Sequence, residues 1–372
     1  MDKERIYASN EYNMNELIDV WVNHVLSGQT FMVVGGTGIG KTQWVYEIAQ
    51  KIGEKTNTKT IVKVFHPART SNTDYVIPII SNDEIKKAIT KEFRELTQDK
   101  DEKGNPIRII AFFDEYDRAD GLTRNALLSL INERVFEDLV LPPTTSIILA
   151  GNQEFSRDTY ELNQAEKARM PIYRFDLKGM TRDSNYFRYW LSIAKEKLNI
   201  DDKIIGFLVA NPEYMFKEEA GSASFPTPRT WELLSKALPY LEKISGDTKL
   251  FAYQSYLGLE CAGKFKMFED YILSMPPAED ILSGKFFPET LDKQYASLQV
   301  LARYVKDEKT LIEVLRFLKE KYGDELLYIF MRSTYSSDKI KRLYSKIISN
   351  NKNADIIKMF AKIANGLSYG GA

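Results

Sequence analysis

The sequence has few of the residues that build disulfides and zinc sites. Among its 372 residues there is one cysteine, Cys261, and there are two histidines, His24 and His66. One cysteine cannot form an internal disulfide, and one cysteine with two histidines supplies too few ligands for a zinc site built from those residue types. These scarcities exclude disulfide scaffolds and Cys/His zinc modules, and they favour a reducing compartment.

Long hydrophobic runs are also missing. The longest uninterrupted apolar stretch, even when glycine is counted, is Ile204–Ala210. A membrane-spanning helix needs about 20 such residues. The chain begins Met-Asp-Lys-Glu-Arg, which is charged and lacks the apolar core of a signal peptide. We therefore expect a soluble, cytoplasmic protein without a membrane partner.

An excess of charge of one sign is absent from the chain as a whole. Its 51 Lys and Arg against 52 Asp and Glu give a formal charge of −1, which argues against coating nucleic acid or a membrane by bulk electrostatics. From Arg332 onward, however, eight Lys or Arg stand against two Asp, a local charge of +6 that leaves −7 for residues 1–331. This basic segment is interpreted either as a solvated helix face or as a surface for an acidic partner or nucleic acid.

Hydrophobic residues are plentiful at 44%, enough for the cores of two or three domains of about 150 residues each. In residues 1–180, short apolar runs alternate with polar-periodic stretches, which is typical of a parallel sheet interleaved with helices. Their near-continuous hydrophobicity predicts strands buried on both faces. The predicted strands are Phe31–Val34, Thr60–Phe65, Ile107–Phe113, Thr145–Ala150 and Ile172–Leu177. A helix is predicted over Asn82–Gln98.

After about residue 180 the strand signals fade and helical periodicity dominates. Predicted helices include Tyr186–Leu198, Lys203–Val209, Thr230–Leu241 and Leu250–Phe268. An α/β portion followed by helices alone predicts an α/β core with one or two helical domains behind it. We expect domains at 1–180, 181–272 and 273–372.

Directly after the first predicted strand, the sequence matches the phosphate-loop pattern G-x-x-x-x-G-K-[ST] and continues into a helical stretch. Glycines let the backbone N–H groups of such a loop approach phosphate oxygens, and the helix N-terminus adds a favourable dipole. Lys41 would reach the β- and γ-phosphates, and the Thr42 hydroxyl would ligate Mg²⁺. The alternative is a glycine-rich turn without a ligand. The predicted nucleotide-binding residues are Gly35, Gly36, Thr37, Gly38, Ile39, Gly40, Lys41, Thr42 and Gln43.

Two adjacent carboxylates, Asp114 and Glu115, follow the third predicted strand. Acids at the carboxyl end of a parallel strand lie where ligands bind in open α/β sheets, and Mg²⁺ would offset their charge. Asp114 is then the Mg²⁺ carboxylate, held partly through water, and Glu115 the base that orients and deprotonates the attacking water. Without the phosphate loop, the pair would indicate only a strand leaving the core.

A polar amide, Asn152, follows the fourth predicted strand after Gly151. Asn is a common turn residue, which is the simplest interpretation. As a third strand-end group beside a nucleotide, Asn152 is predicted to contact the γ-phosphate or the attacking water.

With these motifs the sequence resembles an AAA+ ATPase, and more closely the MoxR-like (dynein-related, AAA_5) branch. The resemblance covers about residues 15–270 and extends weakly to about 300. It rests on the phosphate loop and on four further segments: residues 113–119 with 124–128 and 132–134, residues 149–152, residues 165–170, and Phe225–Trp231.

The resemblance implies roles for three more residues. Asn152 looks like sensor 1, Arg169 like the arginine finger that completes the neighbouring subunit's site, and Arg229, at the start of a lid helix, like sensor 2. Two positions depart from the family pattern, Asp117 in place of the usual Asn, and Met170 in place of the usual Phe. The second departure leaves Arg174 as a rival finger.

The fold implied is a P-loop NTPase three-layer α/β/α core with a parallel five-stranded sheet, followed by an α-helical lid and a further α-helical C-terminal region. Catalysis is assigned to Glu115, Lys41, Asn152, Arg169 and Arg229, with ATP and Mg²⁺ as the cofactors and Thr42 and Asp114 as the metal ligands. The family forms rings, typically hexameric, so we expect a homo-oligomer that remodels or activates a protein partner. By resemblance, that partner carries a von Willebrand factor A-type domain.

Two other functions compete with this one. A nucleic-acid motor would use the basic C-terminal helices, although no nucleic-acid module is recognised. A nucleotide switch without hydrolysis is disfavoured because Glu115 and Arg169 are both present. The triplet that begins at Tyr75 falls where the branch has loops facing the ring's centre, so it would either grip a substrate polypeptide or pack against the core.

Overall fold

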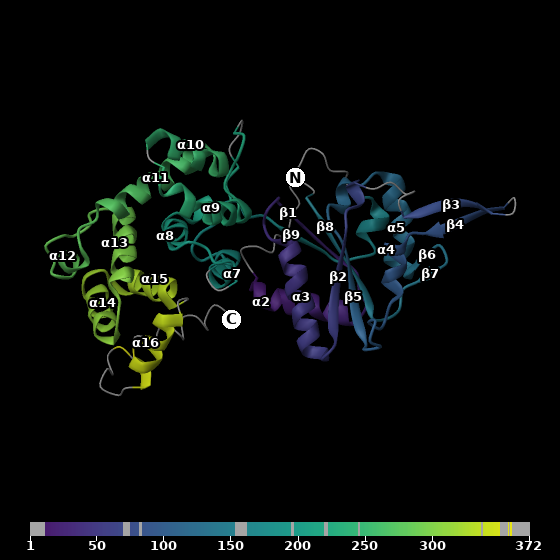
Figure 1. The fold of residues 1–372 in the computed structure, drawn as a ribbon, viewed down its shortest axis with the longest axis horizontal. Coiled ribbons are helices and arrows are strands. Elements are labelled where there is room, and N and C mark those ends of the chain that lie inside the picture. Colours follow the sequence, from purple (N-terminus) through teal and green to yellow (C-terminus); the bar gives the residue numbers. More distant parts are fainter. Residues whose placement is uncertain are drawn as a thin grey trace. The chain divides into compact units, whose positions relative to one another are not determined.

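The computed structural model describes residues 12–69, 75–81, 84–152, 162–194, 197–218, 222–244, 246–335, 338–349, 356 and 358. The chain divides into two compact units, Met1–Leu177 and Lys178–Ala372. The first unit mixes strands and helices, and the described part of the second is helical (Figure 1).

The first unit is built on a five-stranded parallel sheet with the order β2-β5-β8-β1-β9. Its strands are β1 (Phe31–Gly35), β2 (Lys59–Phe65), β5 (Ile107–Phe113), β8 (Thr145–Gly151) and β9 (Ile172–Phe175). Each begins and ends within two residues of its predicted range. The central strands β1 and β8 are buried along their whole length. This confirms the predicted sheet and agrees with strands covered on both faces.

Helices cover both faces of the sheet because successive strand residues point to opposite sides. On one face lie α2 (Met14–Leu26) and α3 (Lys41–Thr56), where the Trp21 ring lies 5.8 Å from Phe31 and 5.7 Å from Trp44. On the other face, α5 (Gly121–Glu133) contributes Leu127 and Leu130 to a buried cluster with the alternate strand residues. The predicted three-layer α/β/α core is therefore confirmed.

The segment between β2 and β5 differs from the prediction. Antiparallel strands β3 (Val76–Ser81) and β4 (Glu84–Ile89) form a hairpin, and α4 (Lys91–Arg94) and η3 (Glu95–Thr97) follow. The predicted helix over Asn82–Gln98 is wrong in its first half, because β3 supplies a run rich in β-branched residues that pairs with β4.

The triplet that begins at Tyr75 lies at the base of this hairpin. Tyr75 is buried, with its ring 4.7 Å from that of Phe93. Tyr75 therefore packs in the core, which is the second of the two interpretations of the triplet.

Short elements complete the first unit. They are η1 (Pro67–Arg69), η4 (Tyr116–Arg118), β6 (Val135–Phe136), β7 (Leu139–Val140) and α6 (Gln164–Lys167).

The second unit is a helical assembly. Its helices are α7 (Asn185–Ala194), α8 (Asp202–Ala210), η5 (Pro212–Met215), α9 (Pro228–Leu241), α10 (Gly246–Leu257), α11 (Leu259–Ser274), α12 (Ala278–Leu282), α13 (Leu291–Tyr304), α14 (Glu308–Lys321), α15 (Gly323–Tyr335) and α16 (Asp338–Ser349). The single helix predicted over Leu250–Phe268 is two helices, because Gly258 takes a positive φ of 76° between them. Since α13 packs against both α8 and α11, helices on both sides of residue 272 share one unit, and the division there stays a prediction.

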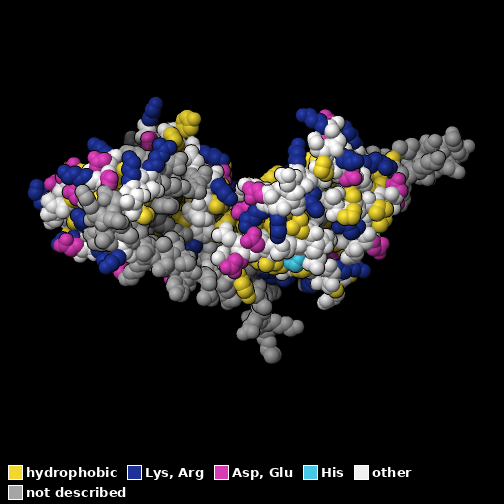
Figure 2. Space-filling view, turned by 90° about the horizontal axis from the view of Figure 1, so that it is seen from below, with side chains coloured by type: hydrophobic (Ala, Val, Ile, Leu, Met, Phe, Trp, Pro, Cys, Tyr) yellow, Lys and Arg dark blue, Asp and Glu magenta, His cyan; other side chains and the backbone are white. Residues whose placement is uncertain are grey.

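The described surface mixes charges of both signs. Figure 2 shows acidic and basic side chains interspersed on the face it presents. The coloured part of that face is therefore not uniformly basic, as a surface that binds a polyanion by bulk charge would be. Much of the basic segment from Arg332 onward lies outside the described residues, so its role stays a prediction.

Among the helices that the structure describes, none is long and apolar enough to cross a membrane.

A buried carboxylate, Glu269 of α11, joins three helices of the second unit. It is 2% exposed and pairs with Lys249 of α10 at 2.9 Å and with Lys203 of α8 at 3.4 Å. Both of its oxygens also accept the hydroxyl of Tyr253 at 3.2 Å. Burial, and then the Glu269 carboxylate, raise the pKa of Tyr253, so the phenol remains a donor.

Replacement of Glu269 by alanine is expected to destabilise the second unit by about 3–5 kcal/mol, because it leaves the buried ammonium group of Lys249 without its counter-charge. Lys203 would keep its second partner, Glu242, at 2.9 Å. Glu232→Ala, which breaks only the exposed i,i+4 pair with Lys236, should cost less than about 1 kcal/mol. Urea-dependent hydrogen exchange of α8, α10 and α11 measures both. Equal costs for the two variants would contradict this account.

Candidate active site

The carboxyl ends of three neighbouring strands bring the predicted site residues to one edge of the sheet. Strand β1 pairs in parallel with β8, with Val34 opposite Gly151, and β5 pairs with β8, with Phe113 opposite Leu149. The residues that follow these strands therefore emerge side by side. Ligands of open α/β sheets bind at this edge.

The glycine-rich loop connects β1 to α3. Gly38 and Gly40 take positive φ values of 79° and 99°, which favour glycine. A Cβ on Gly35 would lie 2.4 Å from the Ile39 side chain and 3.2 Å from the backbone oxygen of Phe175. Because Gly40 is the N-cap of α3 and has no side chain, no cap of its own covers the first N–H groups of the helix.

Lys41 lies folded over this loop. Its Nζ donates to the backbone oxygens of Gly35 at 2.8 Å and Gly36 at 3.0 Å, and to Oδ1 of Asn152 at 2.6 Å. The side chain is only 9% exposed. The structure thus joins the loop lysine directly to the amide at the end of β8, 111 residues further along the chain.

Thr42 and Asp114 place two oxygen ligands together. The Thr42 hydroxyl donates to Oδ2 of Asp114 at 3.3 Å, and both residues are partly exposed. Hydroxyl and carboxylate oxygens suit Mg²⁺, which takes one or two protein ligands and completes its shell with water and phosphate. A cluster of three or more His, Cys, Asp or Glu side chains able to hold a metal is not found in the described part of the chain. The pair therefore fits Mg²⁺ held jointly with a phosphate substrate, rather than a closed protein cage.

Glu115 occupies a tight turn directly after Asp114. Its φ of 56° is left-handed, and its N–H donates to Oδ1 of Asp114 at 3.0 Å. Its carboxylate accepts from Arg118 at 3.0 Å, with both side chains partly exposed. The structure thus places Arg118 on the proposed base, Glu115.

Asp117 is a further residue that sequence reasoning did not assign. It is fully buried and accepts the backbone N–H of Asn152 at 2.7 Å. A Cβ on Gly151 would lie 2.9 Å from Cγ of Asp117, so the glycine allows the turn after β5 to approach the end of β8. The sequence drew attention to Asp117 because this residue stands in place of the usual Asn. That departure does not reveal the contact with the backbone of Asn152.

The two arginines considered for the finger lie in different settings. Arg169 follows α6, is exposed, and donates its backbone N–H to the oxygen of Glu166 at 3.2 Å. Arg174 lies within β9, opposite Val34, and is partly buried. Among the described residues, no hydrogen bond or ion pair joins Arg169 to Lys41 or Glu115.

Arg229 belongs to the second unit, as the second residue of α9. Thr227 and Thr230 form a capping box that fixes the start of this helix, and Arg229 is exposed beside it. Its role toward the nucleotide stays a prediction.

The other predicted loop residues divide by exposure. Gly36 and Ile39 are buried, whereas Thr37 and Gln43 are exposed and Gly38 is intermediate.

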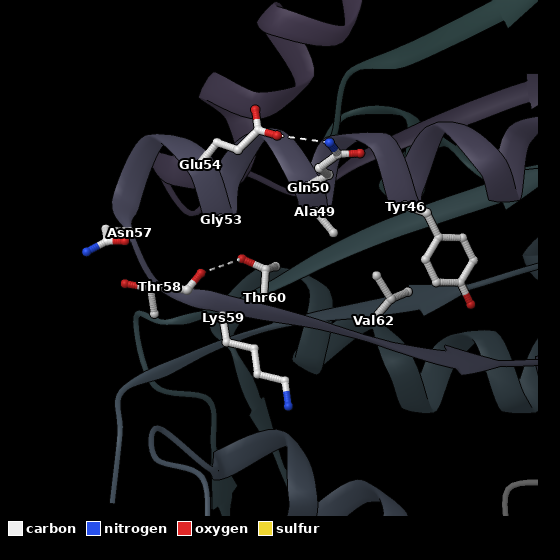
Figure 3. A pocket seen from close by; sticks show the side chains of 10 residues that line it. All are labelled: Tyr46, Ala49, Gln50, Gly53, Glu54, Asn57, Thr58, Lys59, Thr60 and Val62. Carbon is white, nitrogen blue, oxygen red and sulfur yellow. Dashed lines mark hydrogen bonds between the residues drawn. The ribbon is translucent and has the colours of Figure 1, made fainter. Parts of the chain in front are cut away.

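A cavity of about 540 Å³ lies elsewhere on the first unit (Figure 3). It lies between α3 and β2 and includes Asn57 and Thr58 in the turn that joins them. Because this turn precedes β2, it lies at the amino end of the sheet, away from Lys41 and Asp114. The cavity is therefore separate from the candidate active site.

The first unit has a P-loop NTPase fold. This fold is defined by a strand, a glycine-rich loop and a helix in succession, with carboxylates at the end of a second strand. Comparisons with known proteins add little to this. No protein-family model and no curated protein matches the chain.

Solved structures similar to the chain include a mutant RuvB from Thermotoga maritima, which is 13% identical with a TM-score of 0.39 over 79% of this chain and 87% of that one. DnaA from Aquifex aeolicus bound to AMPPCP is 14% identical, with a TM-score of 0.34 over 96% and 93% of the two chains. NtrX from Brucella abortus with ADP is 13% identical, with a TM-score of 0.37 over 82% and 68%. Sequence identities and TM-scores this low support no inference about the function of this chain. That inference must come from the chain's own residues.

Proposed function

We propose that this chain is an AAA+ ATPase that hydrolyses ATP with Mg²⁺. The observation that carries the proposal is the convergence of the phosphate loop, Lys41, the Thr42–Asp114 pair, Glu115 and Asn152 at one edge of the sheet. These residues supply a phosphate cradle, a cation, oxygen ligands for Mg²⁺, a base and an amide.

Each group has a part in phosphoryl transfer to water. The loop N–H groups and the N-terminus of α3 bind the phosphates, and the charge of Lys41 offsets theirs. Thr42 and Asp114 would hold Mg²⁺, and the bound ion would neutralise charge on the transferred group. Glu115 orients the attacking water and accepts its proton.

Asn152 is suited to sense the γ-phosphate. Its side chain contacts Lys41, and its backbone is held by buried Asp117. A phosphate that contacts both Lys41 and Asn152 would connect the start of α3 to the end of β8. We propose that Asn152 positions the γ-phosphate or the attacking water.

We propose that the site is completed by a neighbouring subunit in a ring, with Arg169 as the finger. Its exposed position supports this choice over the partly buried Arg174. An arginine that neutralises charge on the transferred phosphoryl group contributes about 10³–10⁵ in turnover in related chemistry. By resemblance to the MoxR-like branch, Arg229 would act as sensor 2 from the lid.

Also by that resemblance, the ring would be hexameric and act in the cytoplasm to remodel or activate a protein partner, with a von Willebrand factor A-type protein as the expected class. The nucleic-acid alternative depends on the charge of residues 332–372 and stays a hypothesis.

Mixed assemblies test the shared site. Arg169→Ala subunits have an intact loop, and Lys41→Ala subunits have an intact finger. We expect each variant alone to be nearly inactive, whereas an equal mixture should regain a measurable part of the wild-type phosphate release, because some interfaces combine the two intact halves.

A mixture of Arg169→Ala with the double variant Lys41→Ala/Arg169→Ala is the matched control and should stay inactive. The same experiment with Arg174→Ala in place of Arg169→Ala tests the rival finger. Absence of rescue with both arginines would contradict a site shared between subunits.

A further inference from the structure

Three buried polar side chains form a cluster beside the candidate active site, on the α5 side of the sheet. They are Tyr116, Arg124 and Glu166, which are 0%, 7% and 0% exposed. The Tyr116 hydroxyl donates to Oε1 of Glu166 at 3.0 Å, and Arg124 donates to Oε2 at 3.3 Å. The function proposed above uses none of the three.

Glu166 also builds the short helix that precedes Arg169. Its Oε2 accepts the backbone N–H of Asn163 at 2.7 Å, and its own N–H donates to Oδ1 of Asn163 at 2.9 Å. This is a capping box. The backbone oxygen of Glu166 then accepts the N–H of Arg169 at 3.2 Å. The backbone of Arg169 is thus attached to the residue whose side chain is buried in the cluster.

The helix concerned, α6, spans only Gln164–Lys167. A helix of four residues has no stability of its own in water, because the cost of nucleation exceeds the few bonds it makes. Its position must therefore come from tertiary contacts, and those made by the Glu166 carboxylate are buried and charge-assisted. We expect removal of such a contact to displace the segment that follows.

Tyr116 connects the same carboxylate to the catalytic turn. It directly follows Glu115, which is the N-cap of η4. Burial, and then the Glu166 carboxylate, raise the pKa of Tyr116, so its hydroxyl stays protonated and donates. One buried carboxylate therefore connects the turn that holds Glu115 to the segment that presents Arg169.

We propose that Glu166 is a positioning residue that, through Tyr116 and Arg124, sets the place of Arg169 relative to the turn of Glu115. The inference rests on the proposed function, because it concerns how a subunit presents its finger to the next site. Glu166 itself touches no nucleotide in this account. Its substitution should lower the turnover of the neighbouring site while each subunit's own nucleotide binding is retained.

Two single variants test this. Tyr116→Phe removes only the hydroxyl, and Glu166→Gln removes the charge while retaining the shape of the side chain. We expect kcat to fall about tenfold to a hundredfold in each, since a misplacement of about 1 Å can cost about 10²-fold. KM and the affinity for a fluorescent ATP analogue should change less than about threefold, because the loop is intact.

Two controls separate positioning from general loss of structure. Tyr253→Phe makes the same chemical change at another buried Tyr–Glu contact, in the second unit, and should leave kcat unchanged. The double variant Arg124→Gln/Glu166→Gln replaces the ion pair by a neutral amide pair and should recover part of the turnover lost in Glu166→Gln. If Glu166→Gln does not fold, Tyr116→Phe alone carries the test.

The deciding readout is rescue by Lys41→Ala subunits, which donate an intact finger. Tyr116→Phe or Glu166→Gln subunits should be rescued to the same extent as Arg169→Ala subunits. Rescue of Arg169→Ala without rescue of the cluster variants would overturn the positioning role and leave the proposed function standing. Failure to rescue Arg169→Ala would overturn Arg169 as the finger, and the positioning role with it. Unchanged kcat in both cluster variants would also overturn the positioning role.

Discussion

Lys41→Ala is expected to lose ATP binding and to lower phosphate release by at least about 10²–10³-fold, the cost of removing one well-placed donor from developing negative charge. Lys41 contacts both the loop oxygens and Asn152, so its removal deprives two strand ends of their common cation. Fluorescence titration with an ATP analogue and steady-state phosphate release measure the two effects.

Lys51→Ala is the matched control for this change. Lys51 lies on the same helix, α3, but its ammonium pairs on the surface with Asp19 at 2.7 Å. A pair of this kind contributes less than about 1 kcal/mol, so binding and turnover should stay near wild type. Equal losses in both variants would show that helix α3, rather than the Lys41 charge, is responsible.

Glu115→Gln is expected to bind ATP with nearly wild-type affinity and to turn it over about 10²–10⁴-fold more slowly, the range for loss of a general base. Glutamine keeps an oxygen that can accept from Arg118, as the carboxylate does at 3.0 Å, so the turn should be retained. The phosphate ligands Lys41 and Thr42 are untouched. Single-turnover hydrolysis and equilibrium binding separate the two properties.

The control for this variant is Glu54→Gln, an exposed position of α3 whose side chain accepts from Gln50. It should leave both binding and turnover unchanged. Loss of ATP binding in Glu115→Gln, in proportion to its loss of turnover, would mean that Glu115 supports the fold of the site instead of the chemistry.

The sheet and the loop could be predicted because their signals are local. Each strand of the sheet is a near-continuous apolar run, and the phosphate loop contains its glycines and Lys41 within eight residues. Parallel pairing then requires the ends of β1, β5 and β8 to meet at one edge. That rule was sufficient to place Asp114 and Asn152 near Lys41.

The hairpin β3–β4 could not be predicted in the same way. The stretch Glu84–Ile89 has both charged and apolar residues, so it is compatible with a helix face until the pairing with Val76–Ser81 is known. Strand formation there depends on the partner, which is a tertiary effect that outweighs local propensity.

The cluster of Tyr116, Arg124 and Glu166 also lay beyond sequence reasoning. Tyr116 and Glu166 are 50 residues apart, and neither belongs to a motif that requires the other. A weak local signal existed, because Asn163 stands three residues before Glu166, the spacing of a capping box. It would have predicted the helix start, but not the burial of the carboxylate.

Phosphate release from ATP, measured on the purified wild-type chain and on Lys41→Ala side by side, tests the central claim most directly. The account predicts steady release by the wild type in Mg²⁺, loss of that release when Mg²⁺ is chelated, and loss again in Lys41→Ala. Release that is equal in the two proteins, or that continues in the wild type without Mg²⁺, would contradict it.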